Sequence, residues 1–455
     1  MEAIQKNEKR QIFGWMAYDW ANSAFYTTII SVLISPFLIS LASSAVGEDG
    51  VVLDLYAYQV TAKGLPSFCL ALSVLLIVLL LPILGAIADY THLKKRMMAF
   101  FSYLGVLTSS LLFFITESYI ATAVILVVAN MAFASANVFY NAFLIDITTE
   151  DRRDRVSSYG YASGYVGGVV MLLMNLLLIN NAEALGISTG FAVRISFLAA
   201  ALWWGVFALI TFYLLKTPVA ANPIPEGKTI VTVGFSELWQ TLKELKRLRY
   251  TALFLIAYLF YNDGIQTVIL MSSSFLSNEL FTAAERSDGS DQSFLIQIFL
   301  VAQVAALAGA LVFERVARVI GAKYTIIVSL VIWCAIVIFA YAMLATKWQA
   351  VIMGGAIGLV LGSVQALSRS LYSQMIPAGR ENSFFGLYEI SEKGTSWMGQ
   401  LLFSIIVSTT GSFRSAILGL IVFFVTGLIV LLFTDTRRAI HEAGNLTPDE
   451  AARAS

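Results

Sequence analysis

The stretch YDWANSAFYTTI, from Tyr18 to Ile29, places a carboxylate and an amide inside an otherwise apolar run. Asp19 is the only charged residue between Ile12 and Leu41. The run is long enough to cross a bilayer, because a spanning helix needs about 20 mostly apolar residues. A charged side chain at the centre of such a helix costs about 2.5–3.5 kcal/mol on insertion scales. Asp19 is therefore expected to face protein or water and to mark a functional region.

The whole chain has the composition of a membrane protein. Of its 455 residues, 58% are hydrophobic and 13% are charged, and the mean hydropathy is +0.79. Soluble domains carry about 25% charged residues. Twelve apolar runs, separated by short loops, predict an all-α membrane protein with twelve transmembrane helices. These runs are Gly14–Ile39, Phe68–Ala88, Met97–Ile115, Ala121–Ile145, Ser157–Ile179, Phe191–Leu215, Thr251–Phe275, Phe294–Ala317, Tyr324–Leu344, Ala350–Met375, Phe384–Ser408 and Ser415–Phe433.

The distribution of basic residues predicts the orientation of the chain. When loops are assigned to alternate sides, most of the 29 Lys and Arg residues fall on the side of the two termini. Because basic loops stay in the cytoplasm, both termini are expected there. The polar start leads into a run that is too long for a signal peptide, which predicts a retained first helix.

Composition and motifs also argue against several classes of protein. Acidic and basic residues both number 29, so the net charge of +0 indicates no nucleic-acid partner. Cys69 and Cys334 lie inside predicted helices, which fits neither a disulfide framework nor a zinc site. The sequence contains no Walker A loop, so direct ATP hydrolysis is not indicated. We expect no cofactor and no metal.

The first helix has a copy in the second half of the chain. Five residues recur with identical spacing: Ala17, Tyr18, Asn22, Thr27 and Ile29 as Ala257, Tyr258, Asn262, Thr267 and Ile269. Looser matches follow in the same order: Asn141-Ala142 with Gln365-Ala366, and Gly160 and Gly168 with Gly386 and Gly394. Matches in one order favour duplication over chance. We predict two six-helix pseudo-repeats, at 1–215 and 250–434, with a cytoplasmic linker at 216–249 and a cytoplasmic tail at 435–455.

Polar residues inside the predicted helices form a candidate pathway for a solute and a proton. Transporters built from such repeats bind substrate near the membrane midplane, between the halves. Intramembrane ionisable residues mark such pathways. The candidates are Asp19 and Asn22 of the first helix; Asn137 and Asn141 of the fourth; Asn262, Asp263 and Gln266 of the seventh; Gln365 and Arg369 of the tenth; and Glu389, Glu392 and Lys393 of the eleventh. Among these, Asp19 and Asp263 are candidate proton or amine sites, and Arg369 is a candidate partner for a substrate carboxylate.

Each candidate has a structural alternative. Asp19 lies about 10–12 Å from the inner end of its helix, so it could instead pair with a basic loop residue and hold a closed gate. The asparagines of the fourth helix could serve only as hydrogen bonds between helices. Glu389 and Lys393, four residues apart, can neutralise each other. This leaves Glu392 and Arg369, for which we predict an ion pair between the eleventh and tenth helices.

A short basic loop between the second and third predicted helices contains a candidate gate, formed by Gly85, Asp89, Lys94, Lys95 and Arg96. Its spacing resembles the cytoplasmic loop signature of the major facilitator superfamily, which implies a role in gating. The glycine would allow close approach of another helix. Asp89 would accept a charge-assisted hydrogen bond from a basic residue. The sequence differs from the signature at His92, where glycine is usual.

Long segments of the chain resemble the autophagy-related vacuole effluxer family within the major facilitator superfamily. They are YDWANSAFYTTI, NAFLIDITTEDRRDRVSSYGYASGYVGG, YNDGIQT and VQALSRSLYSQMIPAGRENSFFGLYEISEKG, and the likeness extends from Trp15 to Phe433. The resemblance implies that the first, fourth, seventh and tenth helices line a central cavity. Fungal members of the family are associated with release of amino acids from the vacuole. The short loops are similar to those of compact bacterial members, which implies the bacterial cell (inner) membrane.

These features predict a secondary active transporter that moves a small polar solute across the bilayer by alternating access. The resemblance implies amino acids as solute and efflux as direction. A proton is the candidate coupling ion, and we expect a monomer. Two other classes stay open. One is an intramembrane enzyme that uses Asp19 and Asp263 as a carboxylate pair. The other is a non-transporting sensor, although the tail from Thr434 to Ser455 is short, polar and expected to be unfolded.

Overall fold

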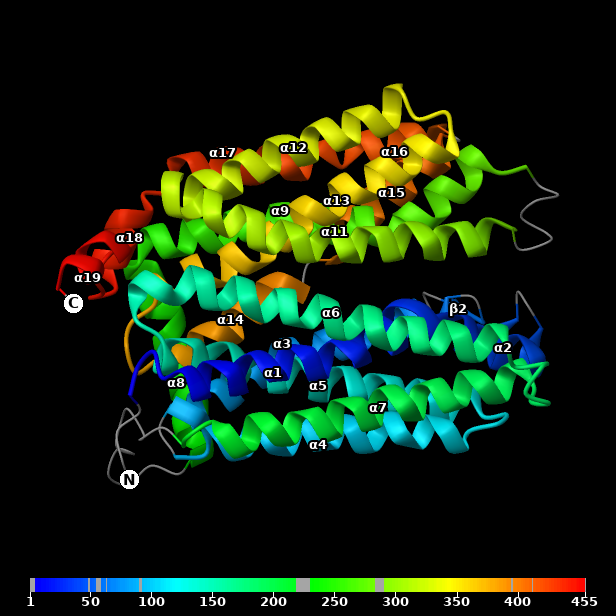
Figure 1. Ribbon diagram of the computed structural model, residues 1–455, viewed down its shortest axis with the longest axis horizontal. Coiled ribbons are helices and arrows are strands. Elements are labelled where there is room, and N and C mark those ends of the chain that lie inside the picture. Colours follow the sequence, from blue (N-terminus) through cyan, green and yellow to red (C-terminus); the bar gives the residue numbers. More distant parts are fainter. Residues whose placement is uncertain are drawn as a thin grey trace.

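The computed structural model shows a bundle of long helices in two layers (Figure 1). The described residues are 5–47, 50–54, 59–62, 64–89, 92–217, 230–282, 290–393, 396–410 and 412–454. Both ends of the chain lie at the same end of the bundle, as Figure 1 shows on its left side. The predicted all-α membrane fold is confirmed, apart from one small hairpin.

The first layer contains the helices up to Leu214 and a two-stranded antiparallel hairpin (Figure 1, blue to green). Its elements are α1 (Lys9–Ala24), the π-helix η1 (Phe25–Leu33), α2 (Ile34–Val46), β1 (Val51–Asp54), β2 (Gln59–Thr61), α3 (Leu65–Asp89), α4 (Lys94–Leu111), the 3-10 helix η2 (Leu112–Phe114), α5 (Tyr119–Ile147), the 3-10 helix η3 (Glu150–Arg152), α6 (Arg153–Asn180) and α7 (Thr189–Leu214).

The second layer begins after a connecting helix, α8 (Ile230–Arg247), that packs against α3. Its elements are α9 (Arg249–Leu280), α11 (Ser290–Ile320), α12 (Ala322–Ala342), α13 (Lys347–Gln374), α14 (Glu381–Lys393), α15 (Ser396–Thr410), α16 (Phe413–Gly419), α17 (Ile421–Phe433), α18 (Thr436–Glu442) and α19 (Pro448–Ala454).

Ten helical segments among the described residues are long and apolar enough to cross a membrane. They include the continuous run of α1, η1 and α2. The 25-residue α3 and the pair α14 and α15 hold the second and eleventh positions of the predicted order. The arrangement is therefore consistent with twelve crossings.

The first crossing changes its helical winding in the middle. Nine residues, Phe25–Leu33, form a π-helix, and Pro36 follows in the first turn of α2. Proline has no N–H to donate and clashes with the carbonyl of the preceding turn. A wider π turn just before it is one way to relieve that conflict. Thr28 of this segment accepts a hydrogen bond from Asn175 of α6 over 2.9 Å.

Contacts between the layers are made by a few helices. α6 packs against α11 and α13, and both α3 and α5 pack against α14. The polar contacts include a hydrogen bond from Ser157 Oγ to the Ala366 carbonyl, at 2.8 Å, and one from Arg153 to the Ser373 carbonyl, at 3.2 Å. Since α6 begins at Arg153 and α13 ends at Gln374, these contacts lie toward the end of the bundle that carries the termini.

The C-terminal tail is folded, so the prediction of an unfolded tail is wrong. α18 and α19 pack at the end of the bundle, where Ile440 is buried. Asn445 Nδ2 donates to the carbonyls of Gln374 and Ile376, both at 2.8 Å, and so satisfies carbonyls left free at the end of α13. α19 also contacts η3 of the first layer. The tail thus touches both layers.

Candidate functional site

Asp19 and Arg369 form an ion pair that joins the two layers. Oδ2 of Asp19, on α1, lies 3.5 Å from Nη1 of Arg369, on α13. Both residues are buried, and Tyr140 of α5 donates a hydrogen bond to the same carboxylate oxygen over 2.6 Å. A buried pair is stable only when extra polar contacts offset the lost hydration of the two charges. Tyr140 supplies one such contact.

The Arg369 guanidinium makes its hydrogen bonds with residues of the first layer. Nε donates to Ser157 Oγ and Nη2 to the Ser157 carbonyl, both at 2.9 Å, and Nη1 donates to Asn141 Oδ1 at 3.3 Å. One residue of the second layer is therefore held by α1, α5 and α6 together. The planar fork of arginine suits this arrangement, because it directs several donors at fixed angles.

Aromatic rings enclose the same guanidinium. Its central carbon lies 4.7 Å from the ring centroid of Trp15, 4.2 Å from that of Tyr161 and 5.6 Å from that of Tyr140. Trp15 stacks on Tyr140 at 4.5 Å and donates its indole N–H to the Tyr140 carbonyl at 2.8 Å. Desolvated cation–π contacts contribute about 2 kcal/mol or more. The rings therefore both exclude water and orient Arg369.

Asn141 extends the network to a second carboxylate of the second layer. Its Nδ2 donates to Oε1 of Glu389, on α14, at 2.9 Å. Its Oδ1 accepts from Arg369, so one amide of α5 contacts both α13 and α14. If the Asn141 amide were flipped, its N–H would face the Arg369 guanidinium and its oxygen would face the Glu389 carboxylate. Only the observed orientation therefore gives both neighbours a hydrogen bond. The predicted contact of Glu389 with Lys393 stays a prediction, because that lysine side chain lies outside the described part of the structure.

The predicted ion pair between Glu392 and Arg369 is wrong, because Arg369 pairs with Asp19. Glu392 Oε2 instead accepts a hydrogen bond from Tyr258 of α9 at 3.2 Å. The Glu392 backbone carbonyl accepts from Asn262 Nδ2 at 2.7 Å. Glu392 is partly accessible and forms no ion pair with any residue that the structure describes. Its carboxylate is thus positioned without a counter-charge among those residues.

Asp263 points into its own layer. It is fully buried, and its Oδ2 accepts a hydrogen bond from the Gly399 N–H at 2.8 Å. Gly399 lies in the first turn of α15, where N–H groups have no partner within the helix. Thr267, one turn along α9, faces the same glycine. Asp263 and Asp19 therefore have different partners and do not belong to one network.

The other predicted polar residues form two further contacts. Asn22 Nδ2 donates to Asn137 Oδ1 at 3.1 Å, within the first layer. Tyr165 donates to Gln365 Oε1 at 2.8 Å, between the layers. Asn137 and Gln365 are partly accessible, as is Gln266, which joins neither contact. Gln365, at the contact between the layers, is therefore more accessible than Arg369, which is buried.

Gly85 of the predicted gate packs against the second layer. A Cβ at this position would lie 2.5 Å from the carbonyl oxygen of Asn382, at the start of α14. Only glycine permits this approach of α3 to α14. The side chain of Asp89 lies outside the described part of the structure.

The basic residues of the same loop bind the first layer. Lys94 forms an ion pair with Asp146 at 2.9 Å, and Lys95 donates to the carbonyl of Leu215 at 2.5 Å. Arg96 is exposed. The loop therefore connects α4 to the ends of α5 and α7, while Gly85 provides its contact with the other layer.

Several residues of the site were absent from the sequence prediction. The predicted pathway residues are charged or carry an amide, whereas these residues are aromatic or hydroxyl-bearing: Trp15, Tyr140, Ser157, Tyr161 and Tyr165. A signal was present in their spacing, because residues four apart share one helix face. Trp15 is four residues before Asp19, and Tyr161 is four residues after Ser157.

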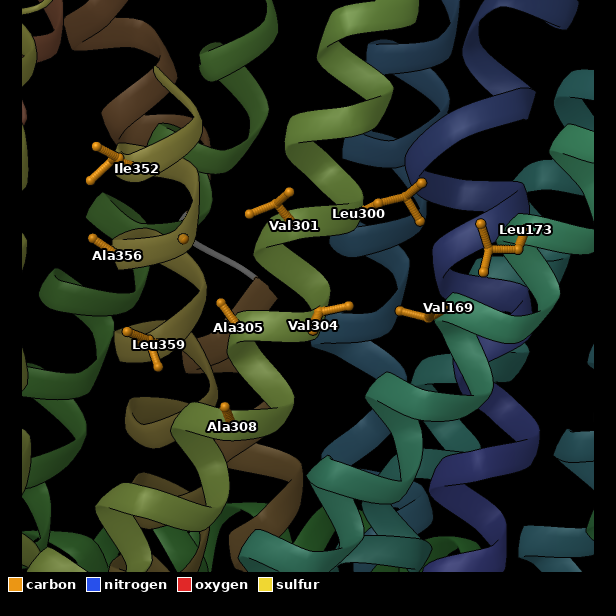
Figure 2. Close-up of a pocket in the computed structure, with 11 residues that line it drawn as sticks. Val169, Leu173, Leu300, Val301, Val304, Ala305, Ala308, Ile352, Ala356 and Leu359 are labelled. Atoms are coloured by element: carbon orange, nitrogen blue, oxygen red, sulfur yellow. The ribbon is translucent and has the colours of Figure 1, made fainter. Parts of the chain in front are cut away.

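A large hollow lies away from these groups, on the flank where α6 meets α11 and α13 (Figure 2). Its volume is about 840 Å³, and its lining is aliphatic throughout, including Val169, Leu173, Leu300, Val304, Ile352 and Leu359. A polar solute would find no hydrogen-bonding side chain there. The polar network between the layers is therefore the better candidate for the functional site.

The fold and the site define a secondary transporter of the major facilitator type. Among solved structures, the chain resembles a bacterial homologue of the iron transporter ferroportin in an outward-facing state, with a TM-score of 0.64 and 13% identity over 94% of this chain and 99% of that one. It also resembles the proton:xylose symporter XylE, with a TM-score of 0.67 and 12% identity over 97% of this chain and 98% of that one.

The chain belongs to the vacuole effluxer Atg22-like family, whose profile matches residues 7–444. It is 34% identical to an MFS-type transporter, YxiO, of Bacillus subtilis strain 168, over 94% of this chain and 96% of the relative. It is 25% identical to autophagy-related protein 22 of Kluyveromyces lactis, over 98% of this chain and 97% of the relative. YxiO and the two solved neighbours are named as transporters and not as enzymes, so the enzyme alternative is rejected.

Proposed function

We propose that this transporter moves a small polar solute by alternating access, and that the Asp19–Arg369 pair locks one end of the pathway. The observation that carries the proposal is that Arg369 of the second layer reaches three helices of the first. The end with both termini opens only if α13 separates from α1, α5 and α6. Arg369 must then break its contacts with the Asp19 carboxylate, the Asn141 amide and Ser157 at the same time.

A proton is the trigger that we propose for this separation. Protonation of Asp19 removes the negative charge that attracts Arg369, and it leaves the Tyr140 hydroxyl able to accept a hydrogen bond instead of donating one. The remaining neutral contacts of Arg369 are weaker than an ion pair. Proton binding at Asp19 would thereby couple to opening of the lock.

Amino acids are the solute class that we propose. Glu392 presents a partly accessible carboxylate without a counter-charge among the described residues, which suits a protonated amine. Arg369 would accept the solute carboxylate once it leaves Asp19, since a guanidinium binds carboxylates with matched geometry. The family is named for efflux from the vacuole, which supports export as the direction.

For the setting of the protein, we propose a monomer in a bacterial cell membrane with both termini in the cytoplasm. The support is the excess of Lys and Arg on the side of the termini. In that orientation the lock closes the cytoplasmic end, and a solute leaving the cell needs the lock to open first.

Counterflow in proteoliposomes tests the function. Vesicles are loaded with one unlabelled amino acid, and accumulation of the same labelled amino acid from outside is measured without a proton gradient. We expect accumulation for part of an amino-acid panel with the wild type and none with Arg369→Ala. Failure of the whole panel would contradict amino acids as solutes. The rival sensor would show no counterflow with any solute, including sugars and peptides.

A further inference from the structure

A second hollow lies between the start of α1 and the start of α6. Its volume is about 280 Å³. The lining combines basic and apolar side chains: Lys9, Ile12, Phe13, Met16, Arg152, Arg155, Val156 and Tyr159. We call this hollow the α1–α6 groove. It is separate from the Asp19–Arg369 network, which faces the other layer.

The mouth of the groove is positively charged. Lys9 and Arg155 are exposed, and neither forms an ion pair with a residue that the structure describes. Arg152 has only a long contact with Asp151, at 3.7 Å. The Arg155 Nε donates to the Tyr159 hydroxyl at 3.2 Å, which holds its guanidinium at the groove. Three cations at one mouth, two of them without such a partner, favour an anion.

The depth of the groove is apolar and open to the outside of the bundle. Phe13 is 60% exposed and belongs to a helical run long and apolar enough to cross a membrane, so its side chain is available to lipid. Met16 follows it along α1, so the groove reaches about 10 Å from Lys9 into the bilayer region at 1.5 Å per residue. Because α1 begins at Lys9 and α6 begins at Arg153, the basic mouth lies where both spans start.

Hydrogen bonds fix the two helix starts that form the groove. Asn7 Nδ2 donates to Thr149 Oγ1 at 2.7 Å, and the Thr149 N–H donates to Asn7 Oδ1 at 3.2 Å. These bonds fix the start of α1 beside η3, which carries Arg152. Deeper in, Ser163 of α6 donates to the Met16 carbonyl at 3.0 Å. The basic groups are therefore placed before any ligand binds.

We propose that the α1–α6 groove binds an anionic phospholipid. The phosphate would lie among Lys9, Arg152 and Arg155, and an acyl chain would follow Phe13 and Met16. Basic pockets between membrane helices at the cytoplasmic boundary suit anionic lipid headgroups. A soluble anion would make no use of the apolar depth, and a zwitterionic lipid would gain less from three cations. The basic mouth and the apolar depth of the groove thus fit one class of ligand.

Native mass spectrometry of the purified protein tests the proposal, with phosphatidylglycerol and phosphatidylcholine as probes. We expect phosphatidylglycerol to bind more tightly than phosphatidylcholine. Lys9→Ala with Arg155→Ala should weaken phosphatidylglycerol binding about 30-fold. Each basic residue near an anionic membrane surface strengthens binding about five-fold, and this variant removes two. Met16→Trp keeps every charge but fills the groove, and should also weaken binding. Unfolding temperatures confirm that both variants fold.

The matched control removes two cations at the same end of the molecule but outside the groove. Lys6 and Arg437 are exposed, and Lys6→Ala with Arg437→Ala should leave lipid binding unchanged. If this control weakened lipid binding equally, the effect would come from general surface charge, and the proposal would be overturned. So would equal binding of the two lipids by the wild type. Displacement of the lipid by inorganic phosphate alone would show a small-anion site and not a lipid site.

Discussion

Ser23 and Asp263 occupy equivalent positions in the two halves, each one residue after the repeated asparagine of its helix. Each faces a glycine of its own layer: a Cβ at Gly164 would lie 2.6 Å from Ser23 Oγ, and one at Gly399 would lie 3.3 Å from Asp263 Oδ2. The repeat therefore aligns Asp263 with a packing residue and not with Asp19. The two halves share the repeated sequence positions, but each half carries its aspartate at a different one of them.

Replacing Asp263 tests whether this carboxylate supports α15. Asp263→Asn keeps an oxygen acceptor for the Gly399 N–H, so we expect a small loss of stability and retained transport. Asp263→Leu leaves that buried N–H without a partner, which costs about 1–3 kcal/mol. Thermal unfolding in detergent compares the two variants. Complete loss of transport in a stable Asp263→Asn protein would instead give Asp263 a role in the transport cycle.

Removing the lock at Arg369 should destabilise the closed end. Arg369→Ala leaves the Asp19 carboxylate buried without its partner, and breaking a buried pair in this way costs about 3–5 kcal/mol. Adding Asp19→Asn to that variant should recover part of the loss, because no buried charge then remains. Unfolding temperatures of the two single variants and the double variant measure this coupling. Additive effects would show that the two residues do not interact.

A methyl group at Gly160 should disturb the same pair through packing alone. A Cβ there would lie 2.6 Å from Asp19 Oδ2 and 2.7 Å from the Trp15 ring, so Gly160→Ala must displace them. We expect a loss of about 1–3 kcal/mol, as for other overpacked cores, with reduced transport. Gly190→Ala is the control, since a Cβ at Gly190 meets nothing within 4 Å. Similar behaviour of the two variants would contradict tight packing at Gly160.

The folded tail should loosen in acid. Hydrogen bonds from His441, at 2.9 Å, and from the Thr447 N–H, at 2.8 Å, lower the pKa of Glu450 from 4.5 to about 2. A lowered pKa means that the charged form stabilises the folded tail above pH 4.5. This contribution is lost as the pH falls from 4.5 towards about 2. The anisotropy of a dye attached to α19 should therefore drop across this range.

Glu450→Gln provides the control for the tail. The variant cannot titrate at this position, so its dye should be mobile at neutral pH and show little change on acidification. A pH response in the variant equal to that of the wild type would assign the effect to a group other than Glu450.

Much of the fold could be predicted because hydrophobic runs determine which segments cross a membrane. Each predicted run overlaps helices among the described residues, and the shared motif of the first and seventh helices reappears as equivalent packing. Other elements were missed for a physical reason. α8, α18 and α19 lie outside the apolar runs, where tertiary contacts such as those of Asn445 decide whether a polar segment folds.

The site could be predicted only in part, because periodicity shows which face a residue occupies but not which helix lies opposite. Asp19, Asn141, Glu389 and Arg369 were all recognised as intramembrane polar residues, and the structure brings them together. Their pairing was not accessible from the sequence, since Glu392 and Asp19 were both chemically suitable partners for Arg369. The enclosing rings of Trp15 and Tyr161 escaped notice because aromatic residues are common throughout membrane helices.

The π-helix between Phe25 and Leu33 has a consequence for comparing this chain with its relatives. A π turn accommodates one residue more than an α turn does, so it behaves as a single-residue insertion in the first crossing. Deleting one residue there would restore regular winding and rotate the two ends of the crossing by about 100° relative to each other. Trp15 and Asp19 would then lose their alignment with α6 if the outer end of the crossing stayed in place. Relatives that lack this wide turn should therefore show a one-residue gap between Phe25 and Pro36.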